Sequence, residues 1–367
     1  MAYSSFKQIP TQSRDDQAPS ISGEMLISII IPVKKISSYL RKETIPALLS
    51  QSYQNFEIIV LPDRPTKEKF PKTKIIATWP RVGPAEKRNL GAKAARGEIL
   101  AFIDDDAYPD KDWLKNALSA INHYPSAIGH QIAAVCGPGV TPPNDPLLWQ
   151  VSGWMWASFL GSGGAGQYRC LPQRRREVDD FPTFNFLVKK EDFEKVGGFN
   201  VNFWPGEDTK LCYDLVYGLG KKIIYDPAVL VYHHRRKIFV PHLKQIGRYG
   251  LHRGFFVKIL PKTSRRIRYF LPSLFTAGIL LGLIVYLLFS ILGFFWLAKT
   301  VALISLLVIG IYLLGLLLTT FWVIKRGGGL IAALLVMPTI LLSHLWYGIM
   351  FLKGLLKKSL QSKFSRR

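Results

Sequence analysis

Short apolar runs separated by polar turns mark the first hundred residues of the chain. The run MLISIIIPV, Met25 to Val33, is continuous and rich in isoleucine, which is typical of a parallel strand buried on both faces. The runs FEIIVLPD, TKIIATW and EILAFI predict three further strands. Before the fourth, Gly83-Pro84 begins a helix over Ala85 to Ala95 that Gly97 ends. This alternation predicts an α/β fold with a doubly wound, mostly parallel sheet.

Acidic residues follow two of these predicted strands. Asp63 comes after the second, and Asp104, Asp105 and Asp106 come directly after the fourth. Ligands of open α/β sheets bind beyond the carboxyl ends of the strands, so these acids are expected to face one crevice. Three adjacent like charges also require a positive partner. On an extended chain Asp104 and Asp106 point the same way and Asp105 points the other way.

Clustered carboxylates of this kind suit a hard divalent cation such as Mg²⁺ or Mn²⁺, which prefers oxygen ligands. A cation held by a few carboxylates keeps part of its charge and can also hold a diphosphate. The alternative for an isolated Asp-x-Asp is a solvated turn after a strand.

Beyond Pro109 the pattern predicts further helices and strands around one irregular segment. Gly161 to Asp180 is rich first in glycine and then in arginine, and predicts a mobile loop. FPTFNFLVKK predicts a strand. GEDTKLCYDLVYGLG predicts a helix with its acids in the first turn, and KKIIYDPAVLVYHH predicts a pair of strands.

Three long apolar segments dominate the C-terminal part, at about 272–296, 301–324 and 330–352. Each is long enough to cross the roughly 30 Å hydrocarbon core of a bilayer and lacks a polar face. The predicted organisation is a flexible N-terminal tail (1–24), an α/β domain (25–260), a basic juxtamembrane segment (261–271), a transmembrane region (272–352) and a basic C-terminal tail (353–367). The N-terminal tail is polar and lacks the apolar centre of a signal peptide.

The 367-residue chain carries a net charge of +23, which fits either nucleic acid or an anionic membrane surface as a partner. Many basic residues flank the apolar segments, and no nucleic-acid motif accompanies them. We therefore expect the lipid bilayer, and no nucleic acid, as the partner. Cys136, Cys170 and Cys212 have no metal or disulfide spacing, which fits a reducing compartment.

The ordered motifs from about Ile27 to Arg253 resemble those of the inverting nucleotide-sugar glycosyltransferases of family 2, which have the GT-A fold. The resemblance rests on four segments, SIIIPV, LLSQSYQNFEIIVLPD, GPAEKRNLGAKAARGEILAFIDDDAYPDKDWL and FEKVGGFNVNFWPGEDTKLCYDLVYGLGKKIIYDPAVLVYHH. It implies a Rossmann-like cytosolic domain, a sugar donor carried on a nucleoside diphosphate, and Mg²⁺ or Mn²⁺.

The resemblance also implies a metal site. Asp104 is expected to contact the nucleotide, and Asp106 to hold the metal with Asp104, with Asp105 close by. A histidine beyond the last strand is a third metal ligand in some GT-A enzymes, which makes His233 the candidate. The alternative is that His233 and His234 are a surface pair.

The resemblance also predicts which residues contact the nucleotide of the donor. They are Pro32 and Val33, at the end of the first strand, and Arg88. Asp63 lies where the family has a carboxylate that reads the base. The family usually has two acids there, whereas this chain has Pro62-Asp63, so the nucleobase stays open.

Glycosyl transfer requires a base, because the acceptor hydroxyl loses its proton as it attacks C1 of the sugar. Asp208 of GEDTK matches the family's base, and Glu207 lies beside it. The alternative is that both acids only complement the positive end of a helix.

Two basic segments are candidates for the acceptor or the diphosphate. QIGRY, with Gln245, Arg248 and Tyr249, resembles the Gln-x-x-Arg-Trp signature of membrane-bound relatives, with tyrosine in place of tryptophan. Its alternative is an interfacial helix whose Arg248 and Arg253 meet lipid headgroups. The arginines of the glycine-rich loop suit phosphate oxygens or, alternatively, anionic lipid: Arg174, Arg175 and Arg176.

The sequence therefore predicts a membrane-anchored glycosyltransferase of the cell inner membrane, with its catalytic domain in the cytoplasm. The expected acceptor is a polyprenyl-phosphate, a lipid-linked glycan or a glycolipid, and the oligomeric state stays open. The rivals are a synthase that extends and exports a polysaccharide, and an inactive membrane scaffold. Three full crossings would put the basic tail outside, against the positive-inside rule, unless one segment re-enters, and Pro338 and His344 make the third segment the candidate.

Overall fold

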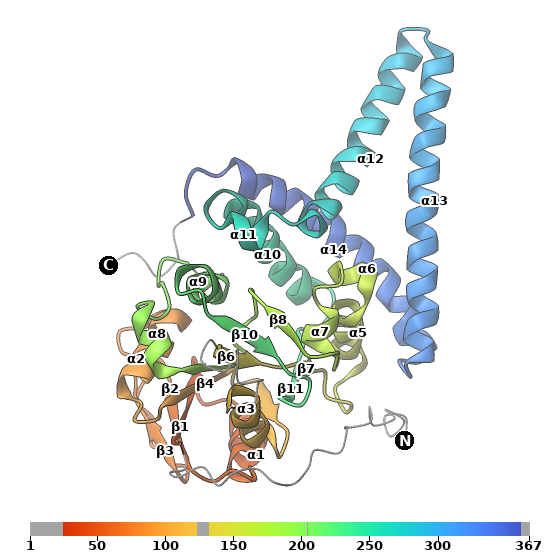
Figure 1. Cartoon of the computed structure of the whole chain (residues 1–367). Helices are drawn as coiled ribbons and strands as arrows, with labels where there is room; N and C mark the ends of the chain where they lie inside the picture. Colours follow the sequence, from red (N-terminus) through yellow and green to blue (C-terminus); the bar gives the residue numbers. More distant parts are fainter. Residues whose placement is uncertain (1–24, 123–131, 204, 361–367) are drawn as a thin grey trace.

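The computed structural model describes residues 25–122, 132–203 and 205–360 (Figure 1). Its centre is an eight-stranded sheet in the order β3-β2-β1-β4-β9-β6-β10-β8. The strands are β1 (Ile27–Pro32), β2 (Phe56–Leu61), β3 (Thr73–Ile75), β4 (Ile99–Ile103), β6 (Ile132–Cys136), β8 (Arg176–Val178), β9 (Asn185–Lys189) and β10 (Lys222–Tyr225). Only β8 and β9 run antiparallel to their neighbours. The predicted mostly parallel α/β sheet is confirmed.

The sheet core consists of the apolar runs that predicted the strands. Every residue of β4 is buried, as are Ile27 to Ile31 of β1, because helices cover the sheet. Helix α2 (Pro84–Ala94) packs on β1 and β2, and α3 (Trp113–Asn122) packs on β6. Gly91 allows the close approach of α2, since a Cβ there would lie 2.5 Å from Ile30 Cγ2.

A small second sheet, in the order β5-β11-β7, lies beyond the end of β4. Strand β5 (Ala107–Pro109) pairs antiparallel with β11 (Val231–His233), and β7 (Gly139–Val140) pairs parallel with β11. Ala107 lies opposite His233 in this ladder. The pairing therefore brings the residue before β5, Asp106, next to His233.

Shorter helical segments complete the domain. They are η1 (Leu40–Thr44), α1 (Ile45–Leu49), α5 (Leu147–Ala157), α6 (Phe159–Ser162), α7 (Gln167–Cys170), α8 (Lys190–Lys195), α9 (Glu207–Tyr213) and η2 (Asp214–Gly218). The glycine- and arginine-rich segment is thus no plain loop, because it forms α6, α7 and β8. The Ser158 hydroxyl accepts the Gly161 N–H at the start of α6, and Gly163, with φ +60°, ends that helix.

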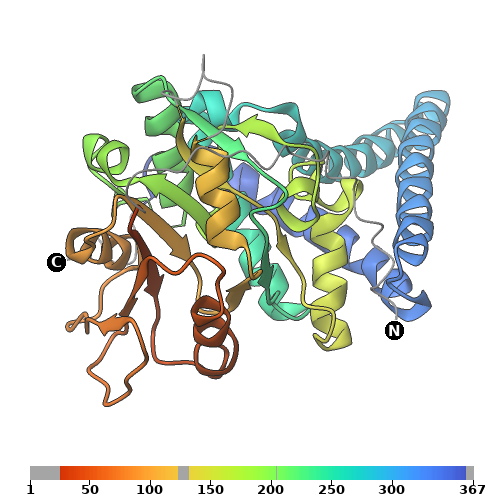
Figure 2. The same ribbon diagram turned by 60° about the horizontal axis from the view of Figure 1, so that its bottom comes forward.

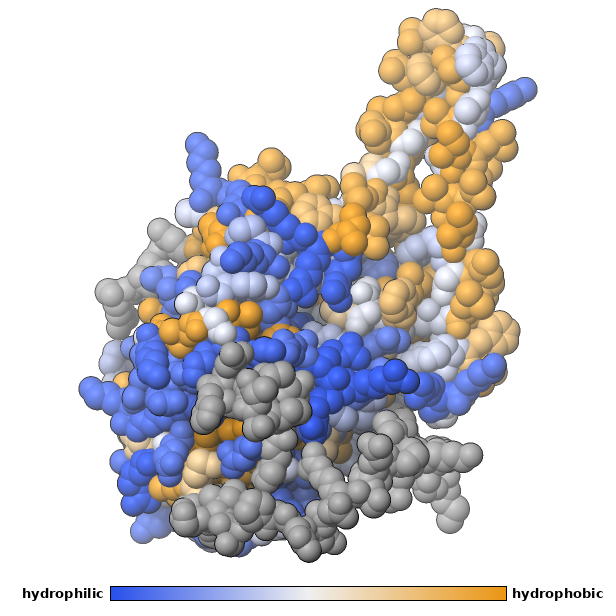
Figure 3. All heavy atoms as spheres, viewed as in Figure 1, coloured by the Kyte–Doolittle hydropathy of each residue, from blue (hydrophilic) through white to orange (hydrophobic). Residues whose placement is uncertain are grey.

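Five helices follow the sheets: α10 (Val240–Ile259), α11 (Pro261–Ser264), α12 (Ile267–Ile291), α13 (Phe295–Lys325) and α14 (Leu330–Leu356). The last three are long and apolar enough to span a membrane, as predicted. In Figures 1 and 2 the α12–α13 hairpin projects away from the sheet, whereas α14 runs back along α10. Figure 3 shows hydrophobic surface concentrated on the hairpin and hydrophilic surface on the domain.

The predicted boundaries of the first two apolar segments were wrong by several residues. The first helix begins at Ile267 rather than near Pro272, and the turn predicted at Leu297 to Thr300 is part of α13. The chain turns instead at Gly293, whose φ of +75° is readily adopted only by glycine. The predicted N-terminal tail (1–24) and the last part of the predicted C-terminal tail (361–367) lie outside the described residues.

Candidate active site

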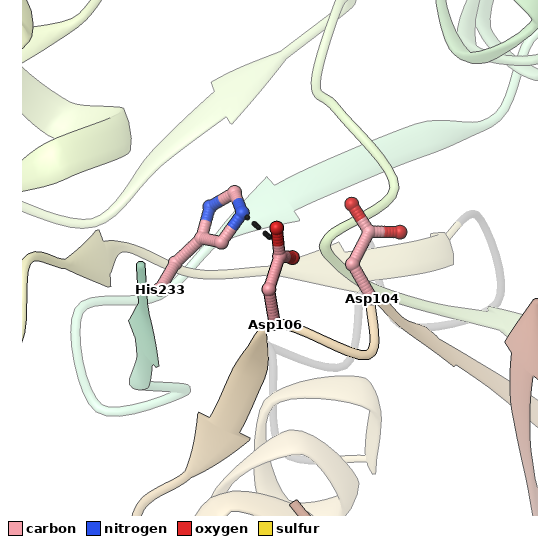
Figure 4. Close-up of side chains that lie close together, drawn as sticks. All are labelled: Asp104, Asp106 and His233. Carbon is pink, nitrogen blue, oxygen red and sulfur yellow. Dashed lines mark ion pairs between the residues drawn. The ribbon is translucent and has the colours of Figure 1, made fainter. Parts of the chain in front are cut away.

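Three potential metal ligands meet where β4 ends and the small sheet begins (Figure 4). The ligand atoms of Asp104, Asp106 and His233 all lie within 4.8 Å of one another. His233 Nε2 is 3.3 Å from Asp106 Oδ1. Two carboxylates and an imidazole form a donor set that fits Mg²⁺ or Mn²⁺, with the nitrogen ligand favouring Mn²⁺. The three residues that the sequence singles out for metal are therefore brought together.

His234 faces the other way from its neighbour. Its Nδ1 lies 2.6 Å from Asp145 Oδ1 and its Nε2 lies 2.9 Å from Glu43 Oε2, while its ring stacks on Tyr39 at 4.2 Å. Both ring nitrogens are engaged by carboxylates. The alternative of a surface histidine pair is wrong, because His234 is held inside the domain and His233 faces Asp106.

Asp105 is separated from the two other aspartates of the motif. Burial raises its pKa to about 6, with a further contribution from the charge of Asp106, and Ser37 hydrogen-bonds to its carboxylate. Its carbonyl oxygen lies 3.3 Å from Thr44 Oγ1. Asp105 and Asp106 lie in a turn between β4 and β5 rather than on an extended chain, and Asp105 is not among the three potential ligands that meet.

Arg88 of α2 is the positive partner that the aspartates require. Its Nη2 lies 3.0 Å from Asp104 Oδ1 and its Nη1 lies 2.9 Å from Glu207 Oε1, and the residue is only 5% exposed. The guanidinium also lies over the Phe199 ring at 5.6 Å. A forked donor can bind two carboxylates at once. Arg88 therefore joins the acids at the end of β4 to those at the start of α9.

The two adjacent acids of α9 have different surroundings. Glu207 is buried and accepts hydrogen bonds from Arg88 and from the Gly206 N–H, at 3.0 Å. Asp208 is half-buried, and its carboxylate accepts the Thr209 N–H at 2.8 Å. Burial, followed by the charges of Glu207 and Asp180, raises the pKa of Asp208 to about 7. Glu207 is placed as a counterion, and Asp208 as a group that exchanges a proton near neutral pH.

Asp180 forms a buried ionic cluster next to Asp208 that the sequence reasoning missed. Its carboxylate accepts Arg253 Nη2 at 2.9 Å and Thr209 Oγ1 at 2.8 Å, and Arg169 Nη2 lies 3.4 Å away. Burial alone would raise the pKa of Asp180, but Arg253 and Arg169 hold it well below the usual range. Arg253 therefore lies inside the domain rather than among lipid headgroups. No spacing rule joins these residues, so the sequence held no signal for the cluster.

The residues predicted for the nucleotide lie at the carboxyl ends of β1 and β2. Lys87 Nζ donates to the Val33 carbonyl oxygen and to the Asp63 carboxylate, and Arg81 Nε lies 3.3 Å from Asp63 Oδ2. Burial lowers the pKa of Lys87 against the attraction of Asp63. Val33 directly follows Pro32, so the ends of β1 and β2 are joined by one buried lysine. The EKRN segment offered a signal for Lys87, since it adjoins Arg88.

Helix α10 brings the QIGRY segment to the acids from the side of the apolar helices. Tyr249 is 42% exposed, and partial burial followed by the charges of Asp208 and Asp104 raises the pKa of its phenol. Tyr249 Oη accepts Gln245 Nε2 at 3.2 Å, and its ring meets Trp156 edge-on at 5.9 Å. Arg248 is exposed on the same helix.

The three consecutive arginines lie at the far edge of the sheet. Strand β8, which begins at Arg176, is separated from β4 by β10, β6 and β9. Arg175 binds the Asp226 carboxylate, Arg176 lies over the Tyr168 ring at 5.1 Å, and Arg174 is exposed. Arg169 is the arginine of this segment that reaches the Asp208 side. A role of the three arginines in acceptor binding stays a prediction.

The parallel strands, the acids at their carboxyl ends and the helical C-terminal region define a GT-A-like glycosyltransferase architecture. Residues 28–197 match the sequence model of glycosyl transferase family 2, and this part of the chain is a glycosyl transferase family 2 domain. The predicted family and fold class are thereby confirmed.

Relatives with assigned activities are distant. A pre-mycofactocin glycosyltransferase of Mycobacterium tuberculosis is 25% identical over 230 residues, which cover 59% of this chain and 44% of that protein. A glucosyl-dolichyl phosphate glucuronosyltransferase of Haloferax volcanii is 21% identical over 230 residues, covering 57% of this chain and 69% of that protein. The chain spans about half the length of the first curated relatives that it matches.

Among solved structures, a mannosyltransferase from Pyrobaculum calidifontis in complex with GDP-Man and Mn²⁺ is similar over nearly the whole chain. The TM-score is 0.54 at 17% sequence identity, and the match covers 95% of this chain and 92% of that one. At this identity the likeness shows a shared fold.

Proposed function

We propose that the protein is a metal-dependent, inverting glycosyltransferase that moves a sugar from a nucleoside-diphosphate sugar to a membrane-associated acceptor. The observation that carries this proposal is the arrangement around Arg88. The guanidinium joins a potential metal site, Asp104 with Asp106 and His233, to a helix start where Asp208 has a pKa near neutrality. The family 2 domain supports the same conclusion.

Asp104, Asp106 and His233 would hold the cation, which when bound neutralises charge on the departing diphosphate. The Val33 and Asp63 edge, with Lys87 between them, is proposed to bind the nucleoside, and Arg88 to position the acids on both sides of the sugar. The mixed oxygen and nitrogen donor set favours Mn²⁺ over Mg²⁺ in this proposal.

Asp208 is proposed as the general base. It accepts the proton of the acceptor hydroxyl while that oxygen attacks C1 on the face opposite the diphosphate, so the anomeric configuration inverts. A base with a pKa near the working pH combines a useful ionised fraction with enough basicity. Glu207 has no free charge for this step, because Arg88 and the Gly206 N–H engage its carboxylate.

The acceptor is proposed to be lipid-linked and to approach along α10. Gln245, Arg248 and Tyr249 lie on this helix, which packs along the apolar helix α14, and Arg248 and Tyr249 are exposed. The name of the haloarchaeal relative refers to a glucosyl-dolichyl phosphate, which supports an acceptor of this class. The domain then faces the cytoplasm, where nucleotide sugars are available, with the apolar helices in the inner membrane.

The test is a transfer assay with the purified full-length protein in detergent, a panel of nucleotide sugars and a membrane lipid extract. Release of nucleoside diphosphate should require one donor, the extract and Mn²⁺ or Mg²⁺, and NMR of the product should show an inverted anomeric centre. Unchanged turnover in EDTA after metal removal would contradict the proposed metal dependence. A product with retained anomeric configuration would contradict the proposed role of Asp208 as the base.

A further inference from the structure

Both ends of the hairpin formed by the apolar helices α12 and α13 contact the domain. At the start of α12, Arg266 pairs with Asp179 of the domain. At the end of α13, the Trp322 ring meets Trp154 of α5 edge-on at 5.9 Å. The turn at Gly293 lies at the tip of the projecting hairpin (Figure 1). A membrane crossed outward by α12 is therefore crossed back by α13.

Helix α14 differs from the hairpin because it remains in contact with the domain from end to end. One third (33%) of its most apolar stretch is buried, against 6% for α12 and for α13. Near its start, Ala333 and Val336 are fully buried in a cluster that includes Trp154. Beyond its middle, the Leu355 carbonyl oxygen accepts Lys258 Nζ of α10 at 2.8 Å. Both ends of α14 are thus fixed beside the domain.

The contact between α10 and α14 is a close approach of two backbones. A Cβ at Gly254 would lie 2.1 Å from the Phe351 carbonyl oxygen, and a Cβ at Gly354 would lie 2.1 Å from the Leu251 carbonyl oxygen. Small residues at such contacts let two helices pack tightly along their length. Helix α14 therefore cannot tilt into the bilayer without taking α10 with it.

Polar groups of α14 face the domain rather than the lipid. His242 of α10 joins Ser152 and Ser343 in a buried chain, with distances of 2.8 Å and 3.1 Å from its two ring nitrogens to the hydroxyl oxygens. The opposite face of α14 is apolar and exposed, and it carries Leu330, Leu334, Leu342, Ile349, Leu352 and Leu356. An apolar stripe opposite a polar or protein-bound face is typical of a helix that lies in the membrane interface.

We infer that only α12 and α13 cross the hydrocarbon core, and that α14 lies in the interface plane with its exposed apolar face against lipid. The occupant is a phospholipid bilayer, because this face adjoins the apolar hairpin and is flanked by exposed Lys244, Arg248 and Lys353. If α14 crossed the bilayer, these charged side chains of α10 and α14 would enter the hydrocarbon core, at a large cost in free energy. The inference concerns the anchor, and it stands whichever sugar or acceptor the enzyme uses.

This topology places the C-terminal tail on the same side as the catalytic domain. Lys357 and Lys358 then share that side with Lys262 and Arg265, in agreement with the positive-inside rule. The conflict that three full crossings would create disappears. Pro338 does not break α14, which is continuous from Leu330 to Leu356. The third segment therefore does not re-enter through a broken helix. It fails to cross because the whole helix lies along the membrane surface.

The first test compares the sides of three single cysteines added to the full chain: Lys67→Cys in the domain, Leu292→Cys at the hairpin turn and Ser359→Cys after α14. The native cysteines are buried and serve as the unmodified background. In intact cells a membrane-impermeant maleimide should label only the Leu292→Cys variant. The Lys67→Cys and Ser359→Cys variants should react only after permeabilisation. Labelling of Ser359→Cys together with Leu292→Cys would show three crossings and overturn the inference.

The second test measures depth in vesicles of phosphatidylcholine and phosphatidylglycerol. A fluorescent label on Ile349→Cys, on the exposed face of α14, is compared with one on Leu307→Cys, in the middle of α13 and 64% exposed. Lipids brominated near the headgroup should quench the first label more, and lipids brominated deep in the chain should quench the second more. Equal deep quenching would mean that α14 spans the bilayer. An Ile349→Cys label that no lipid quenches, together with a disulfide-linked dimer of the unlabelled Ile349→Cys variant after oxidation, would mean that a second copy covers this face.

Discussion

Asp106 and Asp208 lie on the two sides of Arg88, and their carboxylates are prepared in opposite ways. Burial alone would raise the pKa of Asp106, but the adjacent His233 holds it below its usual range. At Asp208 burial acts together with the charges of Glu207 and Asp180, and the pKa rises to about 7. The same type of side chain therefore stays ionised at Asp106, at the strand end, and can accept a proton at Asp208, at the helix start.

The difference follows from where the cations are placed. Arg88 forms its ion pairs with Asp104 and Glu207 rather than with Asp208. Arg253 and Arg169 are engaged by Asp180, so their charge is largely compensated before it reaches Asp208. A carboxylate surrounded by ion pairs, yet outside them, loses solvation without gaining a partner. Such an arrangement is what a general base requires.

The largest expected loss of activity is that of the Asp106→Asn variant. This substitution removes a negative charge from the potential metal site after β4 and leaves the acids at the start of α9 unchanged. A bound metal contributes several kcal/mol of stabilisation to a departing phosphate, so turnover should fall by about 10³ or more. Donor affinity should fall with it, because the same cation holds the diphosphate. Steady-state kinetics with a Mn²⁺ titration and calorimetry of donor binding measure both.

Asp112→Asn provides a matched control, since this aspartate lies in the same segment but beyond the small sheet strand β5. It should retain normal turnover and metal response. If Asp106→Asn kept wild-type kinetics at low Mn²⁺, the strand-end acids would not be the metal site.

The second effect, at the helix start, should appear in turnover alone. Asp208→Asn keeps the shape and removes the basicity, so kcat should drop by about 10² to 10⁴ while donor affinity stays near that of the wild type. Glu207→Gln should instead lower stability, because it leaves the Arg88 guanidinium short of one carboxylate. Thermal unfolding and kinetics of the two variants separate the roles. Abolished transfer in a folded Glu207→Gln variant, with an active Asp208→Asn variant, would mean that the two acids have exchanged roles.

The two sides of this comparison were not equally visible in the sequence. The strand-end acids were predictable because β4 is a short, wholly apolar run that stops at Asp104, and such ends gather ligands in parallel sheets. His233 came from the family resemblance alone, because no pattern in the sequence predicted that Ala107 pairs with it. The family resemblance supplied Asp208 and its neighbour.

The surroundings that set the pKa of Asp208 were not predictable. Asp180 and Arg253 are 73 positions apart, and a contact between a loop and a late helix leaves no periodic pattern. The sequence suggested lipid headgroups as the partner of Arg253 only within the interfacial-helix alternative for this segment. The sequence also ended the first apolar segment near residue 296, whereas the chain reverses at Gly293. Local patterns fixed the elements, and long-range ion pairs decided the chemistry between them.

The third prediction uses pH to separate the two acids. The base form of Asp208 is required, so kcat should be constant above about pH 7 and fall by about tenfold for each pH unit below it. Asp180→Asn should move this acid limb to lower pH, because it removes one of the charges that raise the pKa of Asp208. Measurements of kcat at saturating donor and metal give the limb. A limb that stays near pH 7 in the Asp208→Asn variant belongs to another group.

The smallest expected effect is that of His233→Gln, which tests how much the strand-end side depends on its single nitrogen ligand. Glutamine keeps an oxygen near Asp106 but removes the imidazole. We therefore expect metal affinity to fall by about 10- to 100-fold, which is the loss typical of substitutions at residues that orient metal ligands. Turnover at saturating Mn²⁺ should change little, because Asp104 and Asp106 still supply the charge. The preference for Mn²⁺ over Mg²⁺ should narrow, since oxygen ligands suit Mg²⁺ better than nitrogen does. Titrations of activity with each metal, compared with a His252→Gln control on α10, measure this ratio. An unchanged ratio would mean that His233 orients Asp106 through the 3.3 Å contact and does not bind the cation itself.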